Sequence, residues 1–304
     1  MDRRVSVADV QGLDMGRWVR SQQEAVEQAL VRWVPERTPA DLGEPMRYAV
    51  TGGGKRLRPL LVLAACEAVQ GDPDAALRAA CAVELIHAYS LVHDDMPCMD
   101  NDVLRRGKPT VHVAYGEARA LLAGDALQAL AFELLTPAQG VPAATQAELC
   151  RLLACAAGAQ GMAGGQAIDL ASVGRRLSEE QLRQMHRLKT GALLQASVLM
   201  GAACGVIARR GREALARYGA ALGLAFQVVD DILDVTQDSA TLGKTAGKDA
   251  ADDKPTYVAL MGLEGAREHA GQLLEEAQQA LAASGLADTR ALAALAQMVV
   301  HRTH

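Results

Sequence analysis

Two clusters of aspartate carry the clearest chemical signal in the sequence. The first comprises Asp94, Asp95 and Asp100, and the second comprises Asp230, Asp231 and Asp234. Each cluster follows an apolar segment, where unpaired carboxylates would be costly. Oxygen ligands suit Mg²⁺, which keeps several waters and commonly bridges to substrate phosphates. Two such clusters, 136 positions apart, favour a divalent-metal site over two solvated helix ends.

The two clusters differ in geometry. Asp230 and Asp234 are four residues apart, so both carboxylates lie on one face of a helix. Asp94 and Asp100 are six residues apart, and Pro97 lies between them. Because proline ends or kinks a helix, we expect the chain to leave helical geometry here, which lets Asp100 turn back.

Basic residues accompany both clusters and a glycine-rich loop. The loop, GGGKRLRP at 52–59, opens a predicted helix, whose N-terminus attracts anions. It does not match a Walker A loop, because Ala49 stands where the first glycine belongs and Arg56 replaces Ser or Thr. The first aspartate cluster is followed by Arg105, Arg106 and Lys108, and the second by Lys244, Lys248 and Lys254. This repeated order suits two phosphate-bearing ends held by metal and cations.

Other polar residues interrupt apolar stretches. Lys189 and Thr190 stand at the start of a long uncharged stretch. A lysine at the start of a helix is unfavourable because its charge opposes the helix dipole. A bound anion explains this lysine better than simple exposure to solvent. Gln227 lies three residues before the second aspartate cluster, on roughly the same helix face. The segment 164–169 is a weaker cluster that a helix-end turn explains equally well. His87, taken alone, is more typical of a core residue than of a ligand.

Helices must position these residues. Ala accounts for 58 of 304 residues and aromatic residues for 3%, a composition that favours helices over strands. No linker divides the chain, so we expect one all-α domain over 1–304, a bundle of roughly ten helices around a central cavity. The loops 51–57, 97–110 and 236–255 would carry the chemistry. Apolar periodicity predicts helices at 14–33, 44–51, 58–70, 73–95, 117–135, 145–163, 178–208, 211–235, 256–284 and 288–301.

Charge and local segments restrict the partners. A net charge of −5 provides no basic field for nucleic acid. The six cysteines form no CxxC pair, so a zinc site or disulfide framework is not indicated and a cytoplasmic location is expected. The N-terminus lacks the apolar region of a signal peptide. The uncharged stretch 190–208 is long enough to span a membrane, but its polar residues and glycines favour a buried bundle helix, so we expect no membrane span.

At these motifs the sequence resembles the trans-isoprenyl diphosphate synthases, and within them the bacterial farnesyl diphosphate synthases. The resembling segments are GGGKRLRP (52–59), ELIHAYSLVHDDMPCMDNDVLRRGKPT (84–110), GMAGGQAIDL (161–170), HRLKTGALL (186–194) and FQVVDDILDVTQDSATLGKTAGKD (226–249). The longer DDxxxxD form of the first motif is the one seen in bacterial farnesyl and plant-type geranylgeranyl enzymes. The resemblance implies an all-α fold with a deep cavity, usually in a homodimer, and three Mg²⁺ ions that hold an allylic diphosphate between the two motifs.

The resemblance also assigns roles by position. It makes Asp94 and Asp100 metal ligands with Asp95 assisting, and Asp230 a ligand on the opposite wall with Asp231 and Asp234 in support. It places Arg105, Lys189, Lys244 and Lys254 at the allylic diphosphate, and Lys55, Arg58, His87 and Arg106 at isopentenyl diphosphate. Thr190 and Gln227 match polar groups near the reacting carbon.

The implied reaction is a prenyl transfer. The allylic C–O bond ionises, the double bond of isopentenyl diphosphate attacks the cation, and the departing diphosphate takes the proton. Tyr89 and Ser90 precede Asp94 by five and four residues, so Tyr89 lies about 7.5 Å further along the helix axis from the metal. Its ring would form a firm cavity floor, where plant-type geranylgeranyl enzymes typically have Met. We therefore expect dimethylallyl and geranyl diphosphate as allylic substrates and farnesyl diphosphate as product.

Four alternatives remain open. A geranylgeranyl diphosphate synthase would differ in cavity depth alone. A class I terpene cyclase normally has an Asn/Ser/Glu triad as its second metal motif and lacks a second diphosphate site. A metal-dependent phosphohydrolase could use His93 with Asp94, but the other histidines show no supporting pattern. A non-catalytic partner subunit tends to have lost acidic ligands, whereas both motifs are intact here.

Overall fold

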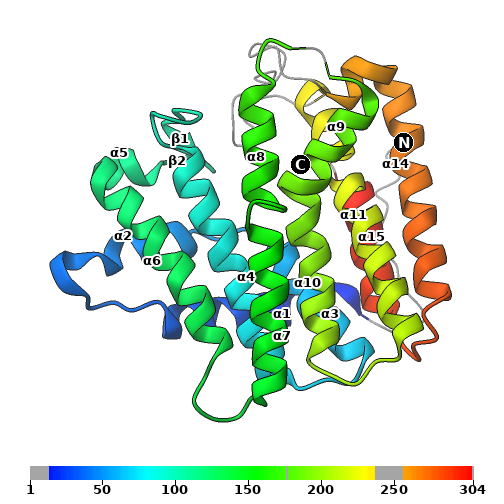
Figure 1. The fold of residues 1–304 in the computed structure, drawn as a ribbon, viewed down its shortest axis with the longest axis horizontal. Helices are drawn as coiled ribbons and strands as arrows, with labels where there is room; N and C mark the ends of the chain where they lie inside the picture. Colours follow the sequence, from blue (N-terminus) through cyan, green and yellow to red (C-terminus); the bar gives the residue numbers. More distant parts are fainter. Residues whose placement is uncertain (1–13, 176, 237–255, 303–304) are drawn as a thin grey trace.

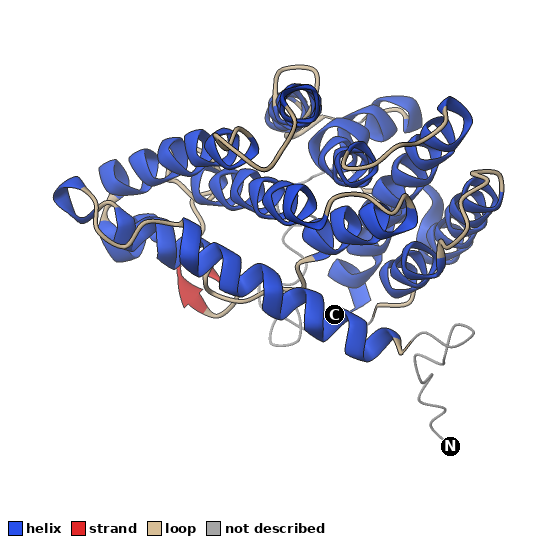
Figure 2. Cartoon of the chain, turned by 90° about the horizontal axis from the view of Figure 1, so that it is seen from below, coloured by secondary structure: helices blue, strands red, loops and turns tan. Residues whose placement is uncertain are grey.

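The computed structural model describes residues 14–175, 177–236 and 256–302. Nearly all regular structure in these residues is helical, and their one strand pair is a short hairpin at the edge of the molecule (Figure 2). The prediction of an all-α fold is confirmed.

The described elements follow one another along the chain in two groups. The first group is α1 (Met15–Trp33), the 3-10 turn η1 (Pro39–Asp41), α2 (Gly43–Val50), α3 (Leu57–Ala68), α4 (Pro73–Asp94), β1 (Leu104–Arg105), β2 (Lys108–Pro109), α5 (Val111–Tyr115) and α6 (Glu117–Leu135). The second group is α7 (Ala143–Ala157), α8 (Met162–Ala171), α9 (Glu179–His186), the π-helical turn η2 (Arg187–Gly191), α10 (Ala192–Ala203), α11 (Arg209–Thr236), α14 (Tyr257–Ala282) and α15 (Arg290–Val300).

Side-chain caps fix two of the predicted helix starts. Asp72 accepts hydrogen bonds from two backbone N–H groups in the first turn of α4, and Pro73 is the first residue of that helix. At the start of α9, Ser178 and Gln181 form a capping box. These contacts satisfy N–H groups that the first helical turn leaves without intrahelical partners.

Small residues let the central helices pack closely. Helix α4 runs through the middle of the bundle and packs against α3, α6 and α10 (Figure 1). Many of its buried positions are alanine. Helices α10 and α3 also approach closely at Gly201. A Cβ on this residue would lie 2.1 Å from the carbonyl oxygen of Val62, so the contact requires glycine.

Membrane-spanning potential within the described ranges is confined to α4. This helix passes on length and apolar character, and 67% of its most apolar window is buried inside the protein. The uncharged stretch at 190–208 forms the end of η2 and helix α10, which stops at Ala203 and is itself largely buried. Both segments therefore serve as core helices of the bundle, as predicted for 190–208.

Two helices predicted as continuous are interrupted. The prediction of one helix over 145–163 is wrong, because α7 ends at Ala157 and α8 starts anew at Met162. A Cβ on Gly161 would lie 2.1 Å from the carbonyl oxygen of Ala156, so the tight turn between the helices requires glycine. The prediction over 178–208 missed η2, where π-helical geometry separates α9 from α10.

The segment 97–110 was predicted as a loop but contains the hairpin of β1 and β2. Its two turn residues, Arg106 and Gly107, have φ angles of 53° and 73°, as a two-residue type I′ turn requires. The short helix α5 follows directly. The hairpin keeps the basic residues of this segment beside the first aspartate cluster.

The C-terminal ends of α4 and α11 lie at the same end of the bundle (Figure 1). The two aspartate clusters therefore face one region of the molecule. Residues 237–255, and with them Lys244, Lys248 and Lys254, lie outside the described residues.

Candidate active site

A cavity of about 380 Å³ opens below the end of α4. Helices α3, α4 and α8 and the turn η2 contribute its walls. The lining includes Arg58, His87, Tyr89, Ser90, His93, Asp94, Met99, Met162, Gln166, Leu170, Lys189 and Thr190. Seven of these residues were predicted from the sequence to bind substrate or metal or to limit product length.

The first aspartate cluster has the predicted turn. Helix α4 ends at Asp94, and the backbone N–H of Asp100 donates to the Asp94 carbonyl oxygen at 2.8 Å. The chain thus returns to bring both residues to the end of α4. Burial, with a smaller contribution from the charge of Asp100, raises the pKa of Asp94 to about 6. This position disfavours an uncompensated negative charge and would gain from a cation.

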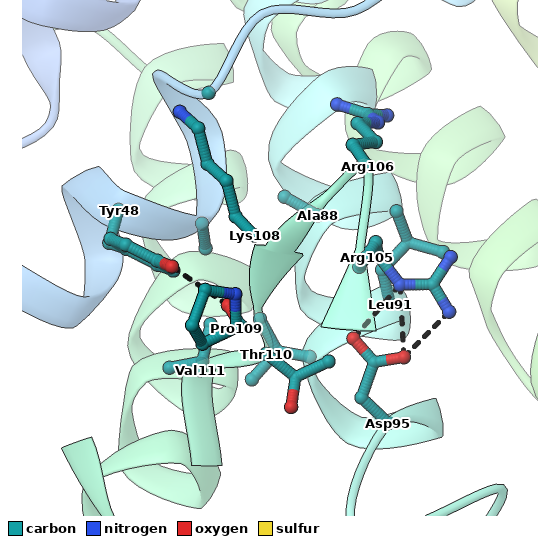
Figure 3. Close-up of a pocket in the computed structure, with 13 residues that line it drawn as sticks. Tyr48, Ala88, Leu91, Asp95, Arg105, Arg106, Lys108, Pro109, Thr110 and Val111 are labelled. Carbon is teal, nitrogen blue, oxygen red and sulfur yellow. Dashed lines mark hydrogen bonds and ion pairs between the residues drawn. The ribbon is translucent and has the colours of Figure 1, made fainter. Parts of the chain in front are cut away.

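Asp95 is absent from the lining of this cavity and contacts the hairpin instead (Figure 3). Arg105 donates to both of its carboxylate oxygens, with Nε at 2.9 Å from each and Nη2 at 2.6 Å from Oδ1. The carboxylate of Asp95 is nearly fully buried. The pair fixes the hairpin against α4, so a residue predicted to assist the metal and one predicted to bind diphosphate contact each other directly.

The glycine-rich loop lies against the hairpin. Arg106 donates from Nη1 to the carbonyl oxygen of Gly53 at 2.5 Å. A Cβ on Gly54, where φ is 144°, would lie 2.9 Å from the same guanidinium nitrogen, so glycine leaves room for Arg106. In Figure 3 the side chains of Arg106 and Lys108 extend to the same side of the hairpin. Both residues line a pocket beside the hairpin, and such cations can bind phosphate groups.

Arg56 occupies an unpredicted position in this loop. Its side chain is buried, and it donates to Glu27 at 2.7 Å, to Glu84 at 2.6 Å and to the carbonyl oxygen of Val50 at 2.6 Å. Its φ is 50°, in the left-handed region that side chains seldom adopt. The left-handed backbone and these ion pairs turn Arg56 inward, whereas Lys55 is exposed and Arg58 lines the cavity.

Arg58 and His87 both line the cavity of the candidate site. Burial, assisted by the charge of Arg106, lowers the pKa of Arg58 to about 10. Burial and the charge of Arg58 also lower the pKa of His87, so the imidazole is neutral at pH 7. The Nε atom of Arg58 is buried and has no hydrogen-bond partner among the described residues. A cation so placed would gain from an anionic ligand.

A chain of hydrogen bonds connects the cavity to α11. Thr190 Oγ1 donates to Gln227 Oε1 at 3.1 Å, and Gln227 Nε2 donates to Asp231 Oδ1 at 2.9 Å. The other oxygen of Asp231 accepts the backbone N–H of Tyr257 at 2.8 Å. Asp231 is therefore occupied in fixing the start of α14 and the orientation of Gln227.

Asp230 and Lys189 each have an ionic partner. Arg302, near the end of the chain, approaches Asp230 Oδ1 to 3.3 Å and lies over the ring of Phe226. Lys189 Nζ lies 2.5 Å from Asp169 Oδ2 on α8. Asp230 also interacts electrostatically with Lys55. Asp234 is buried on the same helix.

The structure adds residues to the predicted set. Gln166 lines the cavity, and neither atom of its side-chain amide has a hydrogen-bond partner in the described parts of the chain. The motif GGQ was visible in sequence but was equally consistent with a turn. No local sequence pattern could have identified Arg302 or the carboxylates around Arg56 as part of the site, because their partners lie 28 to 72 residues away.

Two of the histidines that the structure describes have partners other than a metal. His93 approaches the carbonyl oxygen of Leu121, and His112 approaches the hydroxyl of Thr110. Among the residues that the structure describes, no three His, Cys, Asp or Glu side chains come close enough to hold a metal ion by themselves.

Comparison with known proteins places this site in a family. A family model described as polyprenyl synthetase matches residues 39–294. The farnesyl diphosphate synthase of Geobacillus stearothermophilus is 44% identical over 295 residues, which cover 96% of this chain and 99% of that protein. The chloroplastic heterodimeric geranylgeranyl pyrophosphate synthase large subunit 1 of Arabidopsis thaliana is 46% identical over 295 residues, covering 95% of this chain and 80% of that protein.

A solved structure supports the same family relationship. The crystal structure of the geranyltransferase from Helicobacter pylori, complexed with magnesium and isoprenyl diphosphate, is 36% identical to this chain. Its TM-score is 0.83, and the match covers 94% of this chain and 97% of that one. The relatives thus share one fold, while their names belong to more than one product class.

Proposed function

Because the chain belongs to the polyprenyl synthetase family and is a trans-prenyl diphosphate synthase, we propose that its product is (2E,6E)-farnesyl diphosphate. It would condense isopentenyl diphosphate first with dimethylallyl and then with geranyl diphosphate. One observation carries the choice of product: the ring of Tyr89 lines the cavity, five residues before Asp94 at the proposed metal-binding end of α4.

The acidic residues fit Mg²⁺. They offer oxygen donors alone, and the raised pKa of Asp94 marks a carboxylate whose charge burial disfavours. We propose that Asp94 and Asp100 hold Mg²⁺ on one wall and Asp230 on the other, with the remaining aspartates of both clusters in support. Since no three described side chains converge on one point, they would share the ions with the diphosphate. When bound, the ions neutralise charge that develops on the leaving diphosphate.

The cations of the chain would then hold two diphosphates in different places. Lys189 and Arg105 would bind the allylic diphosphate. Each would contact the diphosphate while it keeps the carboxylate partner that it has in the structure. Lys55, Arg58, His87 and Arg106 would bind isopentenyl diphosphate beside the glycine-rich loop. Lys244 and Lys254 belong to the proposed allylic set and lie outside the described residues.

The chain's own polar groups would guide the reaction. Thr190 and Gln227, held in place by Asp231, present oxygen atoms near the proposed allylic carbon. They would favour the positive charge formed as the C–O bond ionises. The leaving diphosphate accepts the proton lost after the new carbon–carbon bond forms. The apolar remainder of the cavity excludes water, which would otherwise trap the cation.

Product analysis tests this proposal. The purified protein is incubated with Mg²⁺, labelled isopentenyl diphosphate and either dimethylallyl or geranyl diphosphate, and the products are dephosphorylated and separated by length. We expect farnesol as the main product from both substrates. A predominance of the 20-carbon alcohol would instead identify a geranylgeranyl diphosphate synthase, and a cyclised hydrocarbon would identify a terpene cyclase.

We also propose a homodimer in the cytoplasm. Helix α6 exposes Leu121 and Leu122 at 46% and 53% of their surface, which a second copy could cover. All six cysteines are free thiols, as a reducing compartment allows. Light scattering during size-exclusion chromatography would give the mass in solution, and a monomer at micromolar concentration would refute the dimer.

A further inference from the structure

His93, the residue before Asp94, fits into a notch on helix α6. Its imidazole lies directly on Gly124, where a Cβ would be 2.1 Å from Nε2 and 2.6 Å from Cδ2. The Nε2 atom is 3.1 Å from the carbonyl oxygen of Leu121. Because a carbonyl oxygen only accepts, Nε2 carries the hydrogen in this bond. The ring is thus held against α6 by a hydrogen bond and by the absence of a side chain at 124.

The same ring supports Tyr89. The ring centroids of Tyr89 and His93 are 5.7 Å apart, and their planes meet at 75° in an edge-to-face contact. The residues are four apart on α4, and both line the cavity of the candidate site. Tyr89 therefore has a neighbour whose own position depends on α6.

We infer that Gly124 and His93 help to set how far the growing prenyl tail can extend, by fixing the wall against which Tyr89 packs. The inference rests on the proposed function, because it concerns the length of a prenyl product. It adds a specificity-determining position on α6 whose effect passes through His93.

Substitution of Gly124 should displace His93. Helix α6 packs along α4, so the backbones leave little freedom to separate. The imidazole would have to break its bond to Leu121 and rotate toward the cavity that it lines. The space beside Tyr89 would shrink, and elongation would stop earlier. Removal of the ring by His93→Ala would have the opposite effect, since a void would open behind Tyr89.

The test compares product lengths of four proteins under the assay conditions above. For Gly124→Ala we expect the ratio of 15-carbon to 10-carbon product to fall by roughly tenfold, which corresponds to about 1.4 kcal/mol and lies within the usual cost of overpacking. For His93→Ala we expect an increase in 20-carbon product. The double variant Gly124→Ala/His93→Ala should return to products at least as long as those of the wild type, because the displaced ring is absent. Gly271→Ala on α14, whose Cβ would meet no atom within 4 Å, is the matched control and should leave the ratio unchanged.

Unchanged product ratios in Gly124→Ala, or a double variant that keeps the short products of Gly124→Ala, would overturn the inference. If Gly124→Ala does not fold, His93→Ala decides by itself, and an unaltered distribution refutes the role of the ring. A wild type that makes mainly 20-carbon product would refute the proposed product. The role of Gly124 and His93 would still be tested in that case, by the change in product length of each variant relative to the wild type. Histidine nitrogen NMR gives a readout apart from activity: Nε2 of His93 should bear the proton in the wild type and lose its hydrogen bond in Gly124→Ala.

Discussion

Lys189 Nζ and Asp169 Oδ2 lie 2.5 Å apart, across the contact between η2 and α8. This contact depends on Gly165, where a Cβ would lie 2.1 Å from the backbone nitrogen of Lys189. The lysine is therefore positioned before any substrate arrives. A preorganised cation of this kind loses little side-chain entropy when it binds a diphosphate.

Separate diphosphate sites predict separate kinetic effects. Lys189→Ala should raise the KM for the allylic substrate by about 10-fold to 100-fold, because it removes a charge-assisted contact of about 1.5–3 kcal/mol. Lys55→Ala should raise the KM for isopentenyl diphosphate by a similar factor. Steady-state kinetics with each substrate varied in turn measures both. Equal changes in the two KM values for each variant would contradict the assignment.

Loss of a proposed metal ligand should remove activity and preserve the fold. Asp94→Ala and Asp230→Ala should each lower turnover by at least about 100-fold, because the charge on the leaving group would go unneutralised. Far-ultraviolet circular dichroism should show unchanged helicity. A control is Glu275→Ala on the exposed face of α14, which should remain active. Near-normal turnover of either ligand variant at saturating Mg²⁺ would exclude that residue.

The pKa of Asp94 predicts a pH-dependent stability. It is about 6 in the folded protein, against an ordinary value of 3.8, so the folded state binds the proton more tightly than the unfolded state. Binding of this proton stabilises the folded state. The stabilisation is complete below pH 3.8 and is lost as the pH rises through 6. Asp94→Asn cannot ionise, so without Mg²⁺ it should be more stable than the wild type at pH 8, by up to roughly 3 kcal/mol.

Urea unfolding at pH 4.5 and pH 8 checks this prediction. The difference in the free energy of unfolding between the Asn variant and the wild type should be small at pH 4.5 and larger at pH 8. Equal differences at both values would show that Asp94 does not titrate as described.

Arg56 should matter for stability more than for binding. Arg56→Met would leave the buried carboxylate of Glu84 and the partly exposed carboxylate of Glu27 without their cation, at a cost of about 3–5 kcal/mol in the free energy of unfolding. Replacing both glutamates by glutamine in the same protein should recover much of that loss, because no buried charge remains. Urea unfolding of the three proteins measures the effect. Failure of the glutamines to restore stability would mean that packing, and not charge, dominates at Arg56.

Tyr89 should limit product length. Tyr89→Ala removes a ring from the cavity wall, so products of 20 carbons or more should replace part of the 15-carbon product. Ser90→Ala, a smaller change in the next residue, serves as the comparison and should alter the lengths less. A Tyr89→Ala variant that still stops at 15 carbons would show that another residue forms the floor.

The sequence by itself determined the class of fold and the nature of the chemistry. Helix periodicity and alanine content are properties of short segments, so α4 and α11 could be placed to within one or two residues of their ends. Pro97 predicted that the chain leaves helical geometry after Asp94, and the backbone bond from Asp100 to Asp94 confirms the turn. Two aspartate clusters with cations after each pointed to metal and diphosphate without any coordinates, because charge and ligand type are written in the residues themselves.

Tertiary structure alone decided which charged residues face the cavity and which are turned inward. Lys55, Arg56 and Arg58 share one loop, yet Arg56 binds Glu27 and Glu84, which periodicity cannot associate with it. The position of His93 likewise depends on Gly124 of another helix. Such contacts join segments that are remote in sequence, and their geometry follows from how closely whole helices can pack. A local pattern holds no information about that distance, so these features became apparent only from the folded chain.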